Sequence, residues 1–303
     1  ARRALAHEVS RRLARLQRAE DSEFTLDGGG DVLWDGMNVA RLRRGDALVA
    51  PRIDPLASDL LDGVGRERLR RRLAAWLENE IRRRLGPLVR LRDAALSGPG
   101  RGLAFQLVEA GGLLPARQAA AQLRALSPED RRTLQRLGVR IGIETVWLPA
   151  LAKRRAADLL RLLAGLETGA DPGRLVVPMG RPASSPADPA APELLYAVAG
   201  YRRLGGLAVR ADALEKLART ARQLSRQGPF AATEALRATV DCPPEALPPL
   251  LQALGYARRR DAAGESFEQR RRDGAAKRKR SRTAMRIPAD SPFAALHVLR
   301  RRG

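Results

Sequence analysis

Cysteine and histidine are nearly missing from this chain of 303 residues. The one cysteine is Cys242, and the two histidines, His7 and His297, lie at opposite ends of the sequence. A single cysteine excludes an intramolecular disulfide and a cage of thiolate metal ligands. The two histidines are also too few and too far apart in the sequence to suggest a catalytic dyad. Because so little cysteine suits a reducing compartment, we expect a cytoplasmic protein.

Long apolar runs are also missing. No window of 18 apolar residues occurs, and no signal peptide with a charged start and an apolar centre opens the chain. We therefore expect no membrane span. The first residue is Ala rather than Met, and we expect the chain to be part of a longer protein.

Aromatic residues make up only 4% of the chain, whereas 44% of the residues are apolar. The cores must therefore consist of Leu, Ala and Val. A sequence rich in Leu, Ala, Arg and Glu favours helices. We predict an α+β fold that is predominantly α-helical.

Acidic residues are outnumbered, with 34 Asp or Glu against 56 Lys or Arg, a net charge of +22. Such a charge attracts polyanions, because displacing counterions from phosphates favours binding. Only four of these cations are lysines. A strong preference for Arg is also typical of a GC-rich genome, so the alternative is a merely soluble surface with a biased composition.

Changes in periodicity and composition divide the sequence into five segments. In chain order, we expect a helix with a small antiparallel β module (1–54), a helical domain with one isolated strand (55–168), a linker or long loop (169–191), a winged-helix-like domain (192–257) and a disordered basic tail with a short terminal helix (258–303).

Within the helical domain, an apolar stripe predicts a helix over 66–91 that breaks at Gly86-Pro87. The stretch 139–147 alternates apolar and polar residues and predicts a strand, with Trp147 closing its buried face. Pro149 is expected to start the next helix, which would project Lys153, Arg154 and Arg155 from its first turns.

The winged-helix prediction depends on the order helix, turn, helix and strand in the segment that ends near Arg258. Its second helix, "PEALPPLLQALG", contains Pro248-Pro249 and offers only Gln252 for reading base edges. We therefore expect a structural role rather than sequence-specific recognition.

The candidate nucleic-acid-binding residues are basic clusters at the start of a helix, at the start of the tail and in its centre, "AAKRKRSR". They are Lys153, Arg154, Arg155, Arg258, Arg259, Arg260, Lys277, Arg278, Lys279, Arg280 and Arg282.

No set of residues in this sequence predicts catalysis. Gly28-Gly29-Gly30 lacks the Gly-Lys-Ser/Thr that would follow in a phosphate-binding loop, so we interpret it as a turn. The acid pairs Glu78/Glu80 and Glu129/Asp130 are expected on solvated helix faces. We assign no cofactor or metal ligand to this chain.

Several segments resemble, in the same order, the C-terminal accessory region of an alphaproteobacterial superfamily-two helicase similar to the mitochondrial degradosome RNA helicase. The segments are "RLRRGDALVAPRIDPLASDLL", "AAWLENEIRRRLGPLVRL", "GPGRGLAFQLVEAGG", "LGVRIGIETVWLPALAK", "LLYAVAGYRRLGGLAVRADALEKLA" and "DSPFAAL". The resemblance implies an ATP-hydrolysing motor on the N-terminal side in the same polypeptide. ATP and Mg²⁺ would belong to that motor, and Pro248-Pro249 depart from the smoother helix expected before "LGY".

Two functions follow as hypotheses. In the first, the chain guides single-stranded RNA or DNA to or from the motor through sequence-independent contacts with the phosphate backbone. In the second, it is a protein-interaction scaffold that docks the helicase to a nuclease or ribosome. The few aromatic residues argue against base stacking as the main grip.

Overall fold

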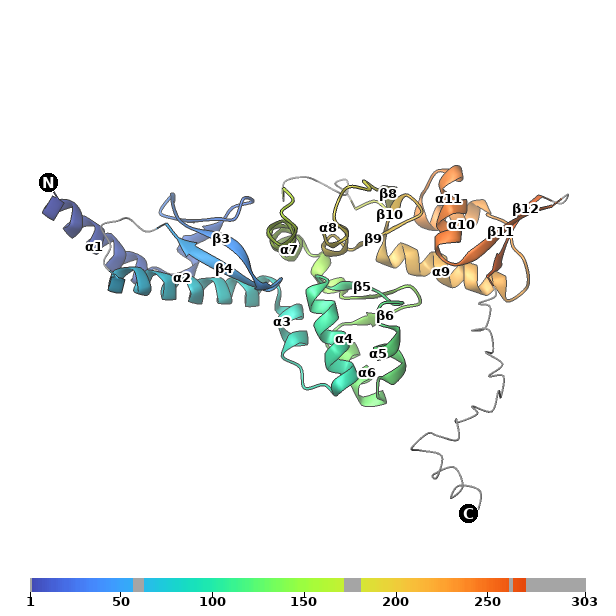
Figure 1. The fold of residues 1–303 in the computed structure, drawn as a ribbon, viewed down its shortest axis with the longest axis horizontal. Helices are drawn as coiled ribbons and strands as arrows, with labels where there is room; N and C mark the ends of the chain where they lie inside the picture. Colours follow the sequence, from blue (N-terminus) through green and yellow to red (C-terminus); the bar gives the residue numbers. More distant parts are fainter. Residues whose placement is uncertain (1, 57–62, 172–180, 262–263, 271–303) are drawn as a thin grey trace, which may run out of the picture. The chain divides into compact units, whose positions relative to one another are not determined.

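The computed structural model describes residues 2–56, 63–171, 181–261 and 264–270. The chain divides into a unit of residues 1–268 and a second unit of residues 269–303. Figure 1 shows the helices and strands. The mixture of helices with small antiparallel sheets confirms the predominantly helical α+β prediction. The expected terminal helix and the cluster 277–282 lie outside the described residues.

The predicted β module near the N-terminus is confirmed as a four-stranded antiparallel sheet in the order β1-β2-β3-β4. The triple glycine lies in the turn between the first two strands, where the Asp27 carboxylate accepts the backbone N–H groups of Gly29 and Asp31 at 2.9 and 2.8 Å. Asp35 and Gly36 form the next turn with φ of 51° and 70°, as a tight hairpin requires. The elements are α1 (Arg2–Arg18), η1 (Asp21–Glu23), β1 (Phe24–Leu26), β2 (Asp31–Trp34), β3 (Met37–Ala47) and β4 (Ala50–Pro55).

A long helix, α2 (Gly63–Arg84), packs against β4 and α1 (Figure 1). Trp76 on its buried face lies 5.7 Å from the ring of Phe24 and donates its indole N–H to the Asp21 carbonyl oxygen at 3.2 Å. The helix ends before Leu85, and α3 (Gly86–Arg92) begins there with Pro87 in its first turn. The predicted break is confirmed, because a proline fits only where no backbone N–H donor is needed.

The predicted isolated strand over 139–147 is wrong. Two short strands, β6 (Arg140–Ile141) and β7 (Thr145–Trp147), form a hairpin, and β7 also pairs with β5 (Leu113–Pro115) in the order β5-β7-β6. Ile143 lies in the turn and is 38% exposed, which breaks the expected alternation. The helices around this sheet are α4 (Gly98–Glu109), α5 (Ala120–Ala125) and α6 (Pro128–Arg136).

The helix expected from Pro149 starts as one short 3₁₀ turn, η2 (Pro149–Ala152), followed by α7 (Arg154–Thr168). The predicted linker 169–191 is structured in part, since β8 (Ser184–Pro186) pairs with β10 (Leu207–Arg210), which also pairs with β9 (Tyr201–Leu204). The helix α8 (Glu193–Val198) directly precedes β9.

The segment predicted to be winged-helix-like forms its own apolar cluster around buried residues such as Leu214, Leu250 and Phe267. Pro248 and Pro249 lie in the first turn of α11, where they cost no hydrogen bond. The elements are α9 (Ala211–Ser225), α10 (Glu234–Val240), η3 (Pro244–Ala246), α11 (Leu247–Ala253), β11 (Tyr256–Asp261) and β12 (Gly264–Gln269). Their order agrees with a winged helix, which stays a prediction.

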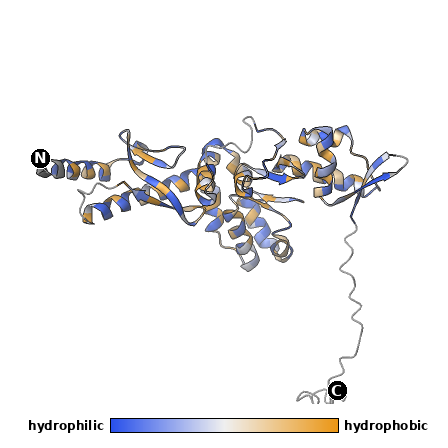
Figure 2. Cartoon of the chain, turned by 45° about the horizontal axis from the view of Figure 1, so that its top comes forward, coloured by the Kyte–Doolittle hydropathy of each residue, from blue (hydrophilic) through white to orange (hydrophobic). Residues whose placement is uncertain are grey.

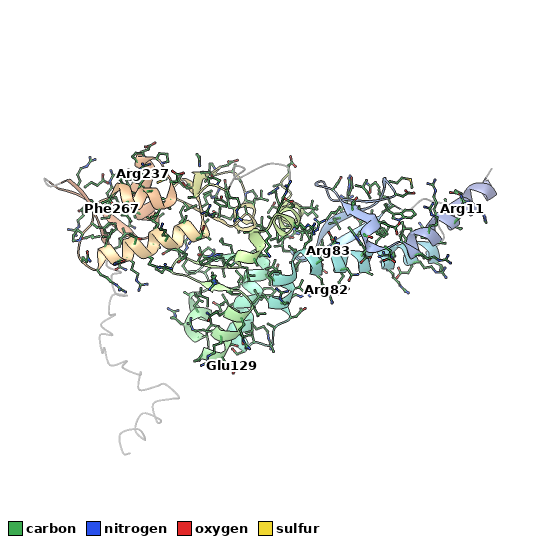
Figure 3. All side chains as sticks on the ribbon, turned by 180° about the vertical axis from the view of Figure 1, so that it is seen from behind. Arg11, Arg82, Arg83, Glu129, Arg237 and Phe267 are labelled. Carbon is green, nitrogen blue, oxygen red and sulfur yellow. The ribbon has the colours of Figure 1, made fainter. Side chains whose placement is uncertain are left out.

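The prediction that the disordered tail begins at residue 258 is wrong. Residues 258–261 and 264–269 belong to the paired strands β11 and β12 rather than to a disordered segment. Phe267, labelled in Figure 3, is fully buried. Its backbone exchanges hydrogen bonds of 2.9 and 2.7 Å with Phe230. The rings of Phe267 and Phe230 also lie 6.2 Å apart. This apolar contact secures a strand pair that is otherwise rich in charge, as the blue of β11 and β12 in Figure 2 shows.

Candidate nucleic-acid interface

A depression of about 880 Å³ is bordered by seven cations and one acid. We call it the basic depression. The cations are Arg82, Arg83, Arg84, Arg90, Lys153, Arg154 and Arg155, and the acid is Asp158. The predicted residues Lys153–Arg155 are all exposed here, and the fold adds four arginines from a distant part of the sequence.

The helix break between α2 and α3 brings the two groups together. Arg82–Arg84 form the last turn of α2, and Arg90 lies on α3 just beyond the break. The opposite wall is the start of α7, which contacts α2. Lys153 is the N-cap residue directly before this helix. Figure 3 labels Arg82 and Arg83 at this end of α2.

Carboxylates balance only part of this charge. Arg82 pairs with Glu78 at 2.6 Å, and Arg83 and Arg84 both bind Glu80, which is only 3% exposed. The expectation that Glu80 lies on a solvated face is therefore wrong. Arg154 is 95% exposed and lies 3.9 Å from Asp158, a distance at which an exposed pair contributes little.

Three cations of the basic depression have no such partner. Within the described part of the chain, no carboxylate oxygen lies within 4.0 Å of Arg90, Lys153 or Arg155. Their charges face solvent and are available to an anion.

The other predicted cluster lies elsewhere, on β11. Arg258 binds Glu265 at 2.8 Å and Arg259 binds Glu268 at 2.5 Å across the strand pair. Arg260 is exposed and has no ion pair with any described residue. None of the three borders the basic depression, so they do not form one site with Lys153–Arg155.

Arg82, Arg83, Arg84 and Arg90 are not among the residues predicted from the sequence to bind nucleic acid. The available signal was "RRRLGPLVR", a run of arginines that ends directly before a Gly-Pro break. Such a run marks a basic helix end. What it packs beside depends on a tertiary contact some 70 residues away, which no local pattern reports.

A second concavity, of about 520 Å³, lies beside Trp147. We call it the Trp147 cleft. It has an apolar floor and three arginines, and its residues include Gly111, Gly112, Trp147, Leu151, Arg140, Arg181, Arg210 and Asp212. Trp147 is half-buried, so it closes its strand less fully than predicted.

A buried carboxylate fixes the strand pair that bears Trp147. Glu215 on α9, only 5% exposed, accepts the backbone N–H groups of Ile143, Glu144 and Thr145 at 2.6, 2.8 and 2.7 Å. It also accepts the Thr145 hydroxyl at 2.7 Å. The β6–β7 turn is therefore clamped from a helix 70 residues further along the chain.

Arg202 also binds the β6–β7 turn. Its guanidinium is 5% exposed and donates to the Glu144 carbonyl oxygen at 2.8 Å, with the Glu144 carboxylate 3.6 Å away. Burial, opposed by Arg202, raises the pKa of the Glu144 carboxyl, and burial lowers the pKa of the Arg202 guanidinium. Both directions follow from burial, which disfavours the charged form of each group.

Across the described residues, no cluster of three or more His, Cys, Asp or Glu side chains could hold a metal ion. No helix in the described ranges is both long and apolar enough to cross a membrane. Cys242 is buried, and burial raises the pKa of its thiol, which disfavours the reactive thiolate. Comparison with protein-family models, with curated proteins and with solved structures finds no match.

Proposed function

We propose that this chain is the non-catalytic, nucleic-acid-binding accessory region of an ATP-dependent RNA helicase, and that the basic depression holds the phosphate backbone of a single strand. The observation that carries the proposal is the convergence of seven cations from two separate parts of the sequence on one depression. The motor, on the N-terminal side in the same polypeptide, would bind ATP and Mg²⁺.

The position of Lys153–Arg155 supports an anionic ligand. The N-terminal end of a helix carries partial positive charge and favours acidic side chains. The first turn of α7 has no acidic residue; it begins with Arg154 and Arg155, and Lys153 directly precedes it. This arrangement is unfavourable in the isolated protein, and a phosphate group would relieve it.

The position of Arg82–Arg84 is explained without a ligand, because the helix dipole places partial negative charge at the C-terminal end of α2 and favours cations there. Their contribution is to bring further positive charge to the opposite wall. Arginine binds phosphate oxygens through paired N–H groups. Contacts of this kind fix a backbone without reading sequence, as expected of a protein that guides any transcript.

The proposal is tested by replacing Lys153, Arg154 and Arg155 with Ala and titrating salt on an unstructured single-stranded RNA. If about three phosphate contacts are lost, the slope of log K against log salt should flatten by about 2 for single strands. Affinity at low salt should fall at least tenfold. Fluorescence anisotropy at several salt concentrations measures both quantities.

A matched control removes the same charge elsewhere. Arg219, Arg222 and Arg226 are exposed and border neither the basic depression nor the Trp147 cleft. Their triple Ala variant should keep most of the parent affinity and slope. Equal losses in both variants would mean that only net charge matters. No loss in either would favour the alternative, a scaffold that docks the helicase to a nuclease or ribosome.

A further inference from the structure

The Trp147 cleft adjoins the basic depression through one short element. Residues of η2 border both concavities, with Ala150 on the side of the basic depression and Leu151 and Ala152 on the side of the cleft. A 3₁₀ turn of four residues spans about 8 Å. A nucleic-acid strand whose phosphate backbone lies along Lys153–Arg155 therefore needs to continue only a short distance to reach the Trp147 cleft.

Trp147 is placed unlike the other two tryptophans. Trp34 and Trp76 are 4% and 1% exposed and belong to the apolar core. Trp147 instead stays half-buried on the wall of a cleft. A partly exposed indole ring beside an apolar floor is a typical binding surface for a flat, apolar group.

Close packing holds the floor of the cleft in place. A Cβ atom on Gly112 would lie 2.1 Å from the Leu151 Cδ1 atom, and one on Gly111 would lie 2.4 Å from the Val198 Cγ1 atom. Both glycines also have positive φ, of 92° and 65°, which residues with a side chain rarely adopt. The chain here approaches its neighbours closely, so the cleft is preformed.

The polar groups of the cleft are cationic. Arg210 is paired with Asp212 at 2.6 Å and donates to the Arg181 carbonyl oxygen at 2.5 Å. Arg181, at φ 54°, in turn donates to the Ala152 carbonyl oxygen at 2.9 Å. Arg140 is exposed and has no carboxylate within 4.0 Å among the described residues. We therefore expect a ligand that contains both a flat ring and an anionic group.

We infer that the Trp147 cleft is a base-binding subsite, in which one unpaired nucleobase stacks on Trp147 while its phosphate lies against Arg140 and Arg181. The inference rests on the proposed function, because the strand reaches the cleft from the basic depression. Stacking tolerates any base, since every base has a flat face. The subsite adds grip and selects single strands over duplexes without adding sequence preference.

Trp147 emission provides the test. Two RNA probes share one length and one phosphate backbone: an unstructured oligonucleotide and its abasic counterpart. The unstructured RNA should quench the Trp147 part of the emission and shield it from acrylamide, whereas the abasic strand should do neither. Trp34 and Trp76 supply a buried background in every sample. The variant W147F should lose the quenching.

Affinity gives a second readout. W147A should bind the unstructured RNA about tenfold more weakly, as loss of one stacked base predicts, and bind the abasic strand as the parent does. W147F keeps a ring and should lie between them. Thermal melts of both variants check the fold, and W147F decides the question if W147A is unstable.

The two proposals fail in different ways. If RNA binds with a dependence on Lys153–Arg155 while Trp147 emission and W147F affinity are unchanged, the subsite is wrong and the proposed function stands. If Trp147 responds to RNA but substitution of Lys153–Arg155 has no effect, the basic depression is wrong and the subsite stands. Absence of any RNA binding overturns both.

Discussion

Asp130 shows how one carboxylate secures two helices. It lies in the first turn of α6, where its backbone N–H donates to the Ser127 hydroxyl at 3.0 Å. Its side chain accepts the backbone N–H of Ser97 at 3.1 Å and also the Ser97 hydroxyl. Ser97 begins α4. The carboxylate therefore serves the N-terminal ends of both helices, which favour negative charge.

The same residue corrects a sequence-based expectation. The pair Glu129/Asp130 was predicted on a solvated face, yet Asp130 is only 5% exposed. The approach of α4 explains the difference. Gly100 leaves room for the carboxylate, because a Cβ atom there would lie 2.9 Å from the Asp130 Cγ atom. A helical periodicity shows which face a residue occupies, but not which helix will cover it.

The variant Asp130→Asn tests this role through pH. Hydrogen bonds from Ser97 lower the pKa of the Asp130 carboxyl. A lowered folded-state pKa contributes stability that is complete above the unfolded-state pKa, about 3.9 for Asp, and is lost as pH falls through the folded value. Asp130→Asn should therefore melt at a lower temperature than the parent at neutral pH, and the difference should shrink in acid. Melting curves across pH measure it.

The control for this prediction is Glu129→Gln, which removes a neighbouring exposed charge from the same helix turn. It should shift the melting temperature far less. If Asp130→Asn and the parent keep the same separation from neutral pH down to pH values well below the ordinary Asp range, the charge of Asp130 is not what stabilises the two helix ends.

Among the elements, the β6–β7 hairpin depends most on a distant residue. The alternation of Val139, Ile141 and Ile143 with polar residues predicts one extended strand. The chain turns instead at Gly142, because Glu215 satisfies three backbone N–H groups there that a continuing strand would have paired. Sequence periodicity could not show this, since the acceptor lies on α9 and is brought in only by tertiary packing.

The other misplaced elements have the same cause. Helices with strong local signals, such as α2 with its Gly86-Pro87 break, were predicted well. The strand β8 was assigned to a linker because its partner, β10, follows about twenty residues later. The strand β12 was assigned to a tail because charge conceals Phe267, which needs Phe230 to be buried. For the proposed site, the sequence singled out Lys153–Arg155 but not the arginines of the opposite wall.

The variant Gly142→Ala tests the hairpin clamp. A Cβ atom at this position would lie 2.2 to 2.4 Å from the Glu215 carboxylate and would displace it from the turn. Leaving buried N–H groups without an acceptor costs about 1–3 kcal/mol each, so we expect a loss of roughly 3 kcal/mol in the free energy of unfolding. Chemical denaturation measures this quantity.

The matched control is Gly102→Ala in α4. Its added Cβ would meet only the Gln122 Cγ atom, at an ordinary 3.7 Å. Alanine should stabilise the helix there by up to about 1 kcal/mol. The clamp is not important for stability if Gly142→Ala unfolds at the same denaturant concentration as the parent.

At the scale of the whole molecule, the positive charge is unevenly divided. Residues 271–303 carry eleven Lys or Arg and two Asp, a net charge of +9, whereas residues 1–270 carry the remaining +13. The larger segment also contains most of the acids, which pair with many of its arginines. Charge per residue is therefore several times higher in the last 33 residues.

This division predicts two separable contributions to RNA binding. A chain that ends at Arg270 keeps both the basic depression and the Trp147 cleft but loses the net +9. If about four to six tail cations each neutralise a phosphate, the truncated chain should lose a salt slope of roughly 3 to 4 for single strands. It should bind more weakly at low salt, and Ala at Lys153–Arg155 should weaken it again. Salt titrations on one unstructured oligonucleotide compare the three proteins.

A full-length control separates charge from chain length. Gln at Lys277, Arg278, Lys279, Arg280 and Arg282 removes five charges and keeps every residue position. Electrostatic attraction falls with each neutralised cation, so this variant should lie between the intact and truncated chains in both slope and affinity. If truncation leaves both unchanged, the tail does not bind phosphate. The affinity must then come from residues 1–270 alone, and substitution of Lys153–Arg155 should abolish most of it.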